Sequence, residues 1–326
     1  MNSKMKMFLI ASALVVSLAG CNKNSNLKED SSRMMQDDKE VIQDVEQEIE
    51  NPDGNYKTGQ DGSVIDDSKD ENLENDVEDM MTESEAVQTM ANINSEEIEK
   101  LDNTKQGWGQ GKNLNSKNQP IDAVNFQTKY GKYNAYFIRD LDKKNVYLTF
   151  DEGYENGYTA PILDVLKDKG VSAVFFVTLP YVKQNPDLIN RMISEGHIVG
   201  NHSVKHKSFP TISVEEGQQE VEGLHNYMKE NYNYDMTLFR FPCGEFSERS
   251  LELLNKLGYK SIFWSYAYAD WDPNKQMEPD KAKEKIVSAA HDGAIYLLHA
   301  VSKTNAEILG DVIDQLKASG YDIPKF

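Results

Sequence analysis

The sequence predicts an α/β fold in which about seven parallel strands and their covering helices form a closed or nearly closed (β/α) barrel. Three observations support this prediction. Beyond residue 107, short β-branched and aromatic runs alternate strictly with amphipathic stretches of helical length, as in parallel sheets covered by helices. The acidic residues concentrate before this region. Glycines follow the helical stretches, where a left-handed cap is favoured: Gly170, Gly196, Gly258, Gly293 and Gly320.

The expected elements follow one another in regular order. Strands are expected at 146–150, 172–178, 197–201, 238–241, 261–265 and 294–299, with a short last strand after Tyr321. Helices are expected between and after them at 158–169, 186–195, 213–230, 247–257, 280–290 and 303–318. The carboxyl ends of parallel strands in such barrels form one rim, where active sites are assembled.

The first twenty residues have the features of an export signal. Lys4 and Lys6 precede an apolar run over 7–18, which is too short to span a bilayer. The string Leu18-Ala19-Gly20-Cys21 resembles the bacterial lipobox. This resemblance implies cleavage before Cys21, acylation of its thiol and anchoring on the outer face of the cytoplasmic membrane. The alternative is an ordinary secretory signal with a chance cysteine.

The region 21–106 is predicted to be a disordered acidic linker. Residues 22–106 contain 8 Lys and Arg against 25 Asp and Glu, in a chain whose formal charge is −19. Such a segment cannot bury enough apolar surface to fold, and its carboxylates repel one another. The alternative is a region that folds on contact with a protein partner. The sequence lacks the clustered Lys and Arg that nucleic-acid binding requires, which excludes nucleic acid as a partner.

Polar groups stand at the ends of the predicted strands in the domain 107–326. Taken alone, each has an ordinary explanation, such as a helix N-cap for Asp151 or a surface ion pair for Arg240. Their shared position at one rim instead favours an active site. The set comprises Asp151-Glu152, His202 with His206, Arg240, Asp270 and His299.

These residue types suit metal-assisted hydrolysis. His202 and His206 are four residues apart and can present two imidazole nitrogens to one ion if the segment turns helically. A nearby carboxylate would complete a site that keeps positions open for water. Such a metal lowers the pKa of a water molecule to about 7. Asp151 is then the expected base for the water proton, and His299 the expected acid for a departing amine.

Five strings occur in the order of the motifs of a known family. Through them, the chain resembles the polysaccharide deacetylase family (NodB homology, carbohydrate esterase 4) over about residues 120–326. The resemblance implies a distorted (β/α) barrel, a divalent metal that is usually zinc, and hydrolysis of an N-acetyl group on an amino sugar. The strings are Thr149-Phe150-Asp151-Glu152-Gly153, His202-Ser203-Val204-Lys205-His206, Arg240-Phe241-Pro242-Cys243-Gly244, Asp270-Trp271 and Leu297-Leu298-His299.

The same resemblance implies a role for each site residue. The implied metal ligands are His202, His206 and Glu152, where Glu152 replaces the usual second Asp of the first motif and is one methylene longer. The implied catalytic residues are the base Asp151, the acid His299 and their orienting partners Arg240 and Asp270.

A narrower resemblance concerns the substrate. The runs 153–159, 264–267 and 299–302 are similar to those of the δ-lactam-biosynthetic de-N-acetylases, the peptidoglycan N-acetylmuramic acid deacetylases of spore-forming bacteria. This similarity implies deacetylation of muramic acid in peptidoglycan and formation of muramic-δ-lactam of the spore cortex. Two alternatives are an N-acetylglucosamine deacetylase acting on peptidoglycan or chitin-like glycans, and a non-catalytic glycan-binding lipoprotein. The complete set of acid, base and orienting partners argues against the last.

Overall fold

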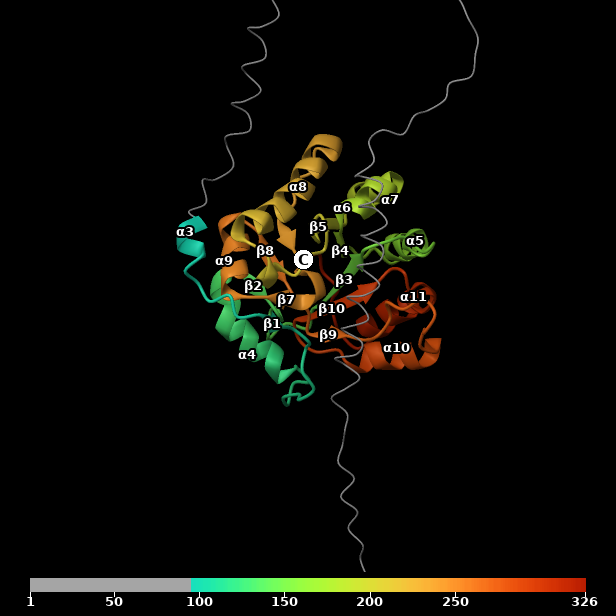
Figure 1. Ribbon diagram of the computed structural model, residues 1–326. Coiled ribbons are helices and arrows are strands. Elements are labelled where there is room, and N and C mark those ends of the chain that lie inside the picture. Colours follow the sequence, from blue (N-terminus) through green and yellow to red (C-terminus); the bar gives the residue numbers. More distant parts are fainter. Residues whose placement is uncertain (1–94) are drawn as a thin grey trace, which may run out of the picture.

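The computed structural model describes residues 95–326 (Figure 1). The predicted signal 1–20, the predicted lipidated Cys21 and the linker up to residue 94 lie outside the described residues. Within 95–326, no helix is long and apolar enough to cross a membrane.

Eight parallel strands form one curled sheet in the order β2-β8-β6-β5-β4-β3-β10-β9. Its two edges, β2 and β9, do not pair with each other in the described part of the chain, so the distorted barrel stays open on one side. The strands are β2 (Ala135–Tyr136), β3 (Val146–Glu152), β4 (Val174–Val177), β5 (Ile198–Asn201), β6 (Leu238–Phe239), β8 (Lys260–Ile262), β9 (Tyr266–Ala267) and β10 (Ala294–His299).

Helices surround this sheet on its outer side (Figure 1). The long ones are α4 (Ile121–Tyr130), α5 (Thr159–Lys169), α7 (Pro186–Ser194), α8 (Val214–Tyr232), α9 (Glu248–Lys256), α10 (Pro279–Ser288) and α11 (Lys303–Ala318). Shorter ones are α3 (Ser95–Ile98), α6 (Leu179–Gln184) and the 3-10 turns η3 (Gly131–Tyr133), η4 (Phe209–Thr211) and η5 (Pro242–Gly244).

The predicted β-α alternation is confirmed. All six predicted helices are present, and their ends lie within two residues of the predicted ends. The six strands expected between 146 and 299 are present as well. The strand expected after Tyr321 is reduced to a single bridge between Asp322 and Asn145.

The predicted glycine caps all have positive φ, from 62° to 84°. At Gly293, an added Cβ would lie 1.3 Å from the carbonyl oxygen of Arg139, so no other residue fits there.

Side-chain alternation distributes the residues of most strands between two apolar layers. One layer lies inside the curled sheet and contains Tyr147, Val174, Phe176, Leu238, Ile262 and Ile295, with Phe326 packed against it. The other lies beneath the helices and forms the main core, which includes Phe150, Phe175 and Val177. A residue at the end of a strand therefore points into the mouth of the barrel when it lies an even number of positions from the inward-facing residues of that strand.

The folded region begins earlier than residue 107. Residues 95–111, here called the N-terminal strap, run across the domain and contribute β1 (Gln106–Gly107), which pairs antiparallel with β7 (Glu245–Phe246). Ile98 and Trp108 of the strap are buried. The indole Nε1 of Trp108 donates to the carbonyl oxygen of Trp264 at 2.9 Å. The strap thus ties the end of the acidic linker to the loop that follows β8.

Candidate active site

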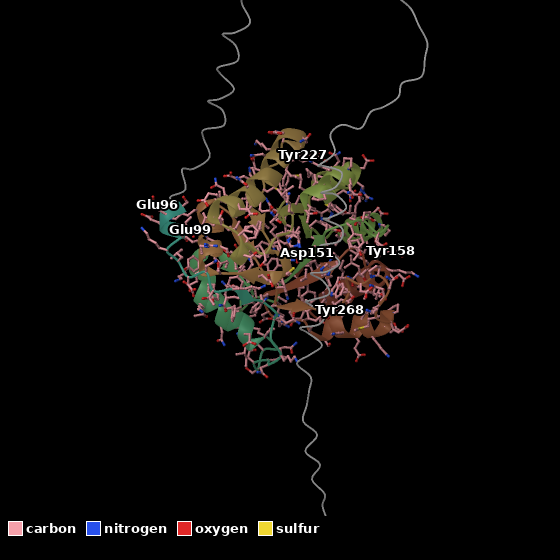
Figure 2. The ribbon with its side chains drawn as sticks, viewed as in Figure 1. Glu96, Glu99, Asp151, Tyr158, Tyr227 and Tyr268 are labelled. Carbon is pink, nitrogen blue, oxygen red and sulfur yellow. The ribbon has the colours of Figure 1, made fainter. Side chains whose placement is uncertain are left out.

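Asp151 and Arg240 form a buried ion pair at the mouth of the barrel. Arg240 Nη1 lies 2.7 Å from Asp151 Oδ1. The guanidinium also donates from Nε to the carbonyl of Ile262 at 3.0 Å and from Nη2 to that of Phe263 at 3.2 Å. Arg240 is fully buried, and the two carbonyls hold its planar fork in one orientation. Asp151 lies at the centre of the domain, far from Glu96 of α3 and from Glu99, which follows this helix, at the periphery (Figure 2).

The environment of Asp151 favours its ionised form. Burial alone would raise its pKa, but the positive charge of Arg240 and the hydrogen bond that Arg240 donates lower the pKa below its usual value. A carboxylate that is ionised at neutral pH can accept a proton. The predicted base is therefore in the protonation state that a base requires.

His202 is held as a neutral imidazole with a defined tautomer. Its Nδ1 lies 2.9 Å from the carbonyl oxygen of Arg240, so Nδ1 carries the proton and Nε2 keeps its lone pair. Burial lowers the pKa of His202 to about 3. His202 Nε2 is 3.6 Å from Asp151 Oδ2 and 3.1 Å from His206 Nε2. The structure therefore brings the two predicted histidines together beside Asp151.

The segment that joins the two histidines is not helical, although the prediction that both bind one ion assumed a helical turn. Ser203 and His206 adopt left-handed backbone conformations, with φ of 74° and 52°. His206 N donates to Ser203 Oγ at 2.9 Å, and Ser203 N donates to Asn201 Oδ1 at 2.8 Å. Left-handed residues other than glycine are strained and persist where the surroundings enforce them. This tight turn brings the second imidazole back toward the first.

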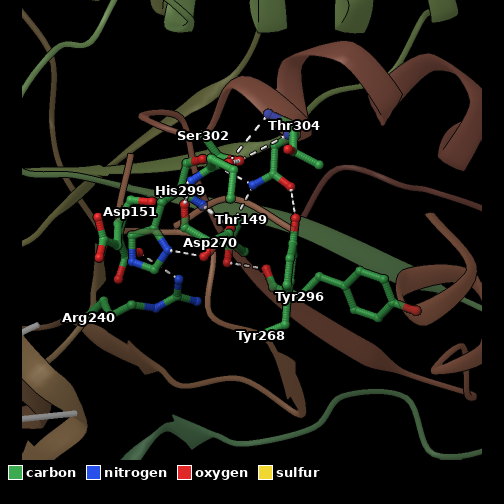
Figure 3. Close-up of polar contacts among 12 residues, drawn as sticks. Thr149, Asp151, Arg240, Tyr268, Asp270, Tyr296, His299, Ser302 and Thr304 are labelled. Carbon is green, nitrogen blue, oxygen red and sulfur yellow. Dashed lines mark hydrogen bonds and ion pairs between the residues drawn. The ribbon is translucent and has the colours of Figure 1, made fainter. Parts of the chain in front are cut away.

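His299 and Asp270 form the other half of the site. Asp270 Oδ1 accepts from His299 Nδ1 at 2.7 Å, and Asp270 Oδ2 accepts from the backbone N of His299 at 2.9 Å. His299 ends β10 as the register partner of Asp151 on β3. Figure 3 shows the imidazole of His299 joined to Asp270 by a dashed line, with Asp151 and Arg240 near it. The predicted acid and base thus lie on neighbouring strands, each with its predicted partner.

Glu152 does not join this group. It is paired in register with Val177, whose side chain belongs to the core beneath the helices. Neither carboxyl oxygen of Glu152 has a hydrogen-bond partner among the described residues. Burial raises its pKa well above the usual range, and the nearby carboxylates of Glu155 and Asp151 raise it further. Glu152 thus lies on the face of β3 opposite Asp151, and its role as the third ligand stays a prediction.

His202 and His206 are positioned to supply two of the ligands that a divalent ion needs. Two nitrogens bound to one ion at about 2.1 Å lie about 3.0–3.4 Å apart, and the Nε2 atoms of His202 and His206 lie 3.1 Å apart. Because Nδ1 of His202 carries the proton, the lone pair of its Nε2 atom remains available for the ion. Among the side chains of residues 95–326, no set of three or more His, Cys, Asp or Glu converges on a metal position. The fit therefore rests on the histidine pair.

Sequence reasoning did not identify the residues that support Asp270. Asn305, in the first turn of α11, donates from Nδ2 to Asp270 Oδ2 at 2.6 Å. Tyr268 contacts Asn305 in turn. Gln276 donates to the carbonyl oxygens of Asp270 and Asp272 at 2.9 and 2.8 Å. The one available signal was a polar residue in the first turn of the helix that follows His299, and such residues usually serve as helix caps.

Comparisons with known proteins show the family to which this chain is similar. A family model described as polysaccharide deacetylase matches residues 138–262. Peptidoglycan-N-acetylmuramic acid deacetylase PdaA of Bacillus subtilis is 42% identical over 227 residues, which cover 69% of this chain and 86% of that protein. A solved structure of Bacillus subtilis PdaA, a family 4 carbohydrate esterase, has a TM-score of 0.66 and 40% identity, covering 69% of this chain and 96% of that one.

A second solved structure gives the same result. A family 4 carbohydrate esterase from Bacillus anthracis has a TM-score of 0.57 and 38% identity, covering 69% of this chain and 95% of that one. The family model ends at residue 262, but both structures extend over most of the described region. The chain therefore belongs to the polysaccharide deacetylase family, carbohydrate esterase family 4.

Proposed function

We propose that this chain hydrolyses the N-acetyl group of N-acetylmuramic acid residues in peptidoglycan. The observation that carries the proposal is the pairing of a buried Asp151–Arg240 unit with a buried Asp270–His299 unit on the neighbouring strands β3 and β10. A base and an acid, each held by its own partner, match the two proton transfers of amide hydrolysis. The 42% identity to the Bacillus subtilis N-acetylmuramic acid deacetylase supports this choice of substrate.

Asp151 acts in the first step. As water attacks the acetyl carbonyl carbon, Asp151 takes one proton from the water, and Arg240 keeps the carboxylate oriented through its Nη1 contact of 2.7 Å. Because Arg240 is itself held by two backbone carbonyls, Asp151 cannot move far from the reacting centre. Such fixed groups avoid the cost of reorganisation during the reaction.

His299 acts in the second step. When the bond between the carbonyl carbon and the sugar nitrogen breaks, the departing amine needs a proton, and the imidazolium of His299 supplies it. Asp270 accepts from Nδ1 of His299, which leaves Nε2 as the atom that delivers this proton. The products are acetate and a free amino sugar. In a muramic residue without its peptide, the free amine can close onto the lactyl carboxyl with loss of one water molecule and yield muramic-δ-lactam.

We further propose a divalent metal, with zinc as the expected ion, held by His202 and His206. When bound, such an ion supplies a Lewis acid that polarises the acetyl carbonyl and lowers the pKa of water to about 7. The support for this proposal is the 3.1 Å separation of the two Nε2 atoms and the tautomer of His202. Elemental analysis of the purified protein tests it directly.

The substrate is tested by comparing glycan strands. Purified protein is incubated with peptide-free peptidoglycan strands, peptide-bearing strands and chitin oligomers, and released acetate and product masses are measured. We expect deacetylated muramic acid from peptide-free strands. Release from glucosamine units alone would instead favour the N-acetylglucosamine deacetylase, and binding without release of acetate would favour the non-catalytic glycan-binding protein.

The location outside the cytoplasm is also a proposal. The lipobox at 18–21 and the acidic composition of 22–106 support a lipid-anchored protein whose linker lets the domain reach peptidoglycan above the membrane, in the envelope of a spore-forming cell. Cys21→Ala should move the protein from the membrane to the soluble fraction. Replacing residues 25–94 by a scrambled segment of equal composition should preserve the muramic-δ-lactam content of the wall. Loss of the product with the scrambled segment would point to a specific protein partner of the linker.

A further inference from the structure

Asn305 is a buried polar residue that the two proton-transfer steps do not use directly. It is 1% exposed and lies in the first turn of α11, where its backbone N donates to the N-cap side chain of Ser302 at 3.0 Å. Its own side chain is therefore not needed to cap the helix. An amide buried this deeply requires hydrogen-bond partners, because an unsatisfied buried amide is costly.

The partners of Asn305 are the two residues of the acid unit. Its Nδ2 donates to Asp270 Oδ2 at 2.6 Å and to the backbone carbonyl of His299 at 3.1 Å. Asp270 Oδ2 also accepts from the backbone N of His299, which leaves Oδ1 for the imidazole Nδ1 of the same residue. Three N–H donors thus fix both oxygens of the carboxylate, and only one of these donors belongs to Asn305.

Tyr268 selects the orientation of this amide. An Asn side chain can present either its oxygen or its nitrogen to a partner. The Tyr268 hydroxyl, on the loop after β9, donates to Asn305 Oδ1, so Nδ2 is the atom that faces Asp270. Tyr268 is itself buried, and it is labelled in Figure 3 together with Asp270 and His299.

We infer that Asn305, oriented by Tyr268, is a positioning residue that holds Asp270 in line with His299. This inference rests on the proposed function, in which His299 protonates the leaving amine. Without the Nδ2 donor, the carboxylate of Asp270 can rotate away from the geometry in which it accepts from both the ring and the backbone of His299. The imidazole then loses the partner that fixes its tautomer and direction, as when a supporting residue is removed behind a catalytic histidine.

The test compares three substitutions with a matched control. Asn305→Asp is nearly isosteric but places an oxygen against Asp270, Asn305→Ala removes the amide, and Tyr268→Phe removes only the hydroxyl. We expect kcat to fall by about 10- to 100-fold in the Asn305 variants and less in Tyr268→Phe, with KM little changed. The control is Tyr227→Phe, because Tyr227 lies on α8, far from Tyr268 (Figure 2). Its kcat should equal that of the wild type.

A second readout does not depend on turnover. A proton shared between His299 Nδ1 and Asp270 is expected to give a downfield resonance in the proton NMR spectrum of the full chain. Asp270→Asn should abolish this resonance, Asn305→Asp should shift or broaden it, and Tyr227→Phe should leave it in place. Wild-type kcat together with an unchanged resonance in the folded Asn305 variants would overturn the inference. A wild-type protein that releases no acetate would instead refute the proposed function, while the NMR comparison would still decide the role of Asn305.

Discussion

Asp151 and Glu152 are consecutive residues of β3, yet their carboxyl groups lie on opposite faces of the sheet. Asp151 faces the inside of the barrel and pairs with Arg240 at 2.7 Å, whereas Glu152 lies beneath the helices without a hydrogen-bond partner in the described part of the chain. Adjacent residues of a strand necessarily diverge in this way. The two acidic residues of the first motif therefore have different environments and different expected roles.

This divergence leads to a prediction about metal retention. His202→Ala and His206→Ala should each lower the metal content of the purified protein, because each removes one of the two facing nitrogens. Glu152→Gln is the matched variant and should keep the metal, since its side chain does not reach the histidine pair. Elemental analysis after dialysis measures this. A strong loss of metal in Glu152→Gln would show that Glu152 is a ligand. Full metal occupancy in either His variant would show that the substituted histidine is not a ligand.

A second prediction separates the base from the residue that orients the acid. Asp151→Asn should keep the fold but lower kcat by about 10²- to 10⁴-fold, because the base is removed. Asp270→Asn should lower kcat by about 10- to 100-fold, because His299 remains and loses only its partner. Steady-state kinetics of acetate release decide between these outcomes. Near wild-type turnover in Asp151→Asn would show that another group accepts the water proton.

The rim residues were predictable because their positions follow from strand ends. His202, Arg240 and His299 each continue the inner alternation of their strands, so an apolar run that ends in a polar residue was enough to place them. The same alternation, applied to Glu152, would have placed it on the other face. Periodicity was thus informative along β3, β5 and β10, whereas Arg240 was placed by the end of the short apolar run at the two-residue strand β6.

Other parts could not be predicted from local patterns. The strands β2 and β9 contain two residues each, which is too few for a hydrophobic period. The contact between Tyr268 and Asn305 joins a loop to a helix 37 residues away, so no local spacing indicates it. In the N-terminal strap, the buried Ile98 and Trp108 are separated by polar residues and stand at the end of an acidic segment whose composition predicted disorder.

Arg240 should be more important for stability than a surface arginine. Arg240→Met leaves the carboxylate of Asp151 buried without its partner, and removing one member of a buried pair costs about 3–5 kcal/mol. Arg191, which pairs with Asp164 at the surface and is 32% exposed, is the matched control. Arg191→Met should cost about 0–1 kcal/mol. Urea unfolding gives both free energies, and equal losses in the two variants would contradict the buried-pair assignment.

Two buried histidines outside the site predict that stability falls in mild acid. Burial lowers the pKa of His197 and of His291 below the usual value, so each is neutral in the folded protein while the unfolded chain titrates near 6.5. Below that pH the unfolded state binds more protons, and each histidine reduces the free energy of unfolding by at most about 1.4 kcal/mol per pH unit.

The contribution of His197 can be isolated. Its Nδ1 accepts from the backbone N of Ala173 at 3.1 Å, a role that the side-chain oxygen of asparagine can imitate. His197→Asn should therefore weaken the pH dependence of unfolding between pH 7 and pH 5 without abolishing folding. Urea unfolding at several pH values is the measurement. An unchanged slope in the variant would assign the acid sensitivity to other groups, with His291 as the next residue to test.

The N-terminal strap should contribute to stability although it precedes the predicted domain. Trp108 is 6% exposed, packs against Phe126 and Phe137 with ring centroids 4.8 and 4.7 Å away, and donates to the carbonyl of Trp264. Trp108→Ala should cost about 3–5 kcal/mol, as is typical of a large aromatic residue removed from a core. Leu114, which is 53% exposed, provides the control.

The two variants should differ clearly in urea unfolding, since Leu114→Ala removes little buried surface and should change the free energy by no more than about 0.5 kcal/mol. The strap also lies against the loop after β8, whose Trp264 ring is 5.8 Å from the guanidinium carbon of Arg240. Loss of Trp108 should therefore lower kcat as well as stability, because the support behind Arg240 becomes looser. If Trp108→Ala unfolds at the same urea concentration as the wild type, the strap is only loosely attached and the domain begins closer to residue 107.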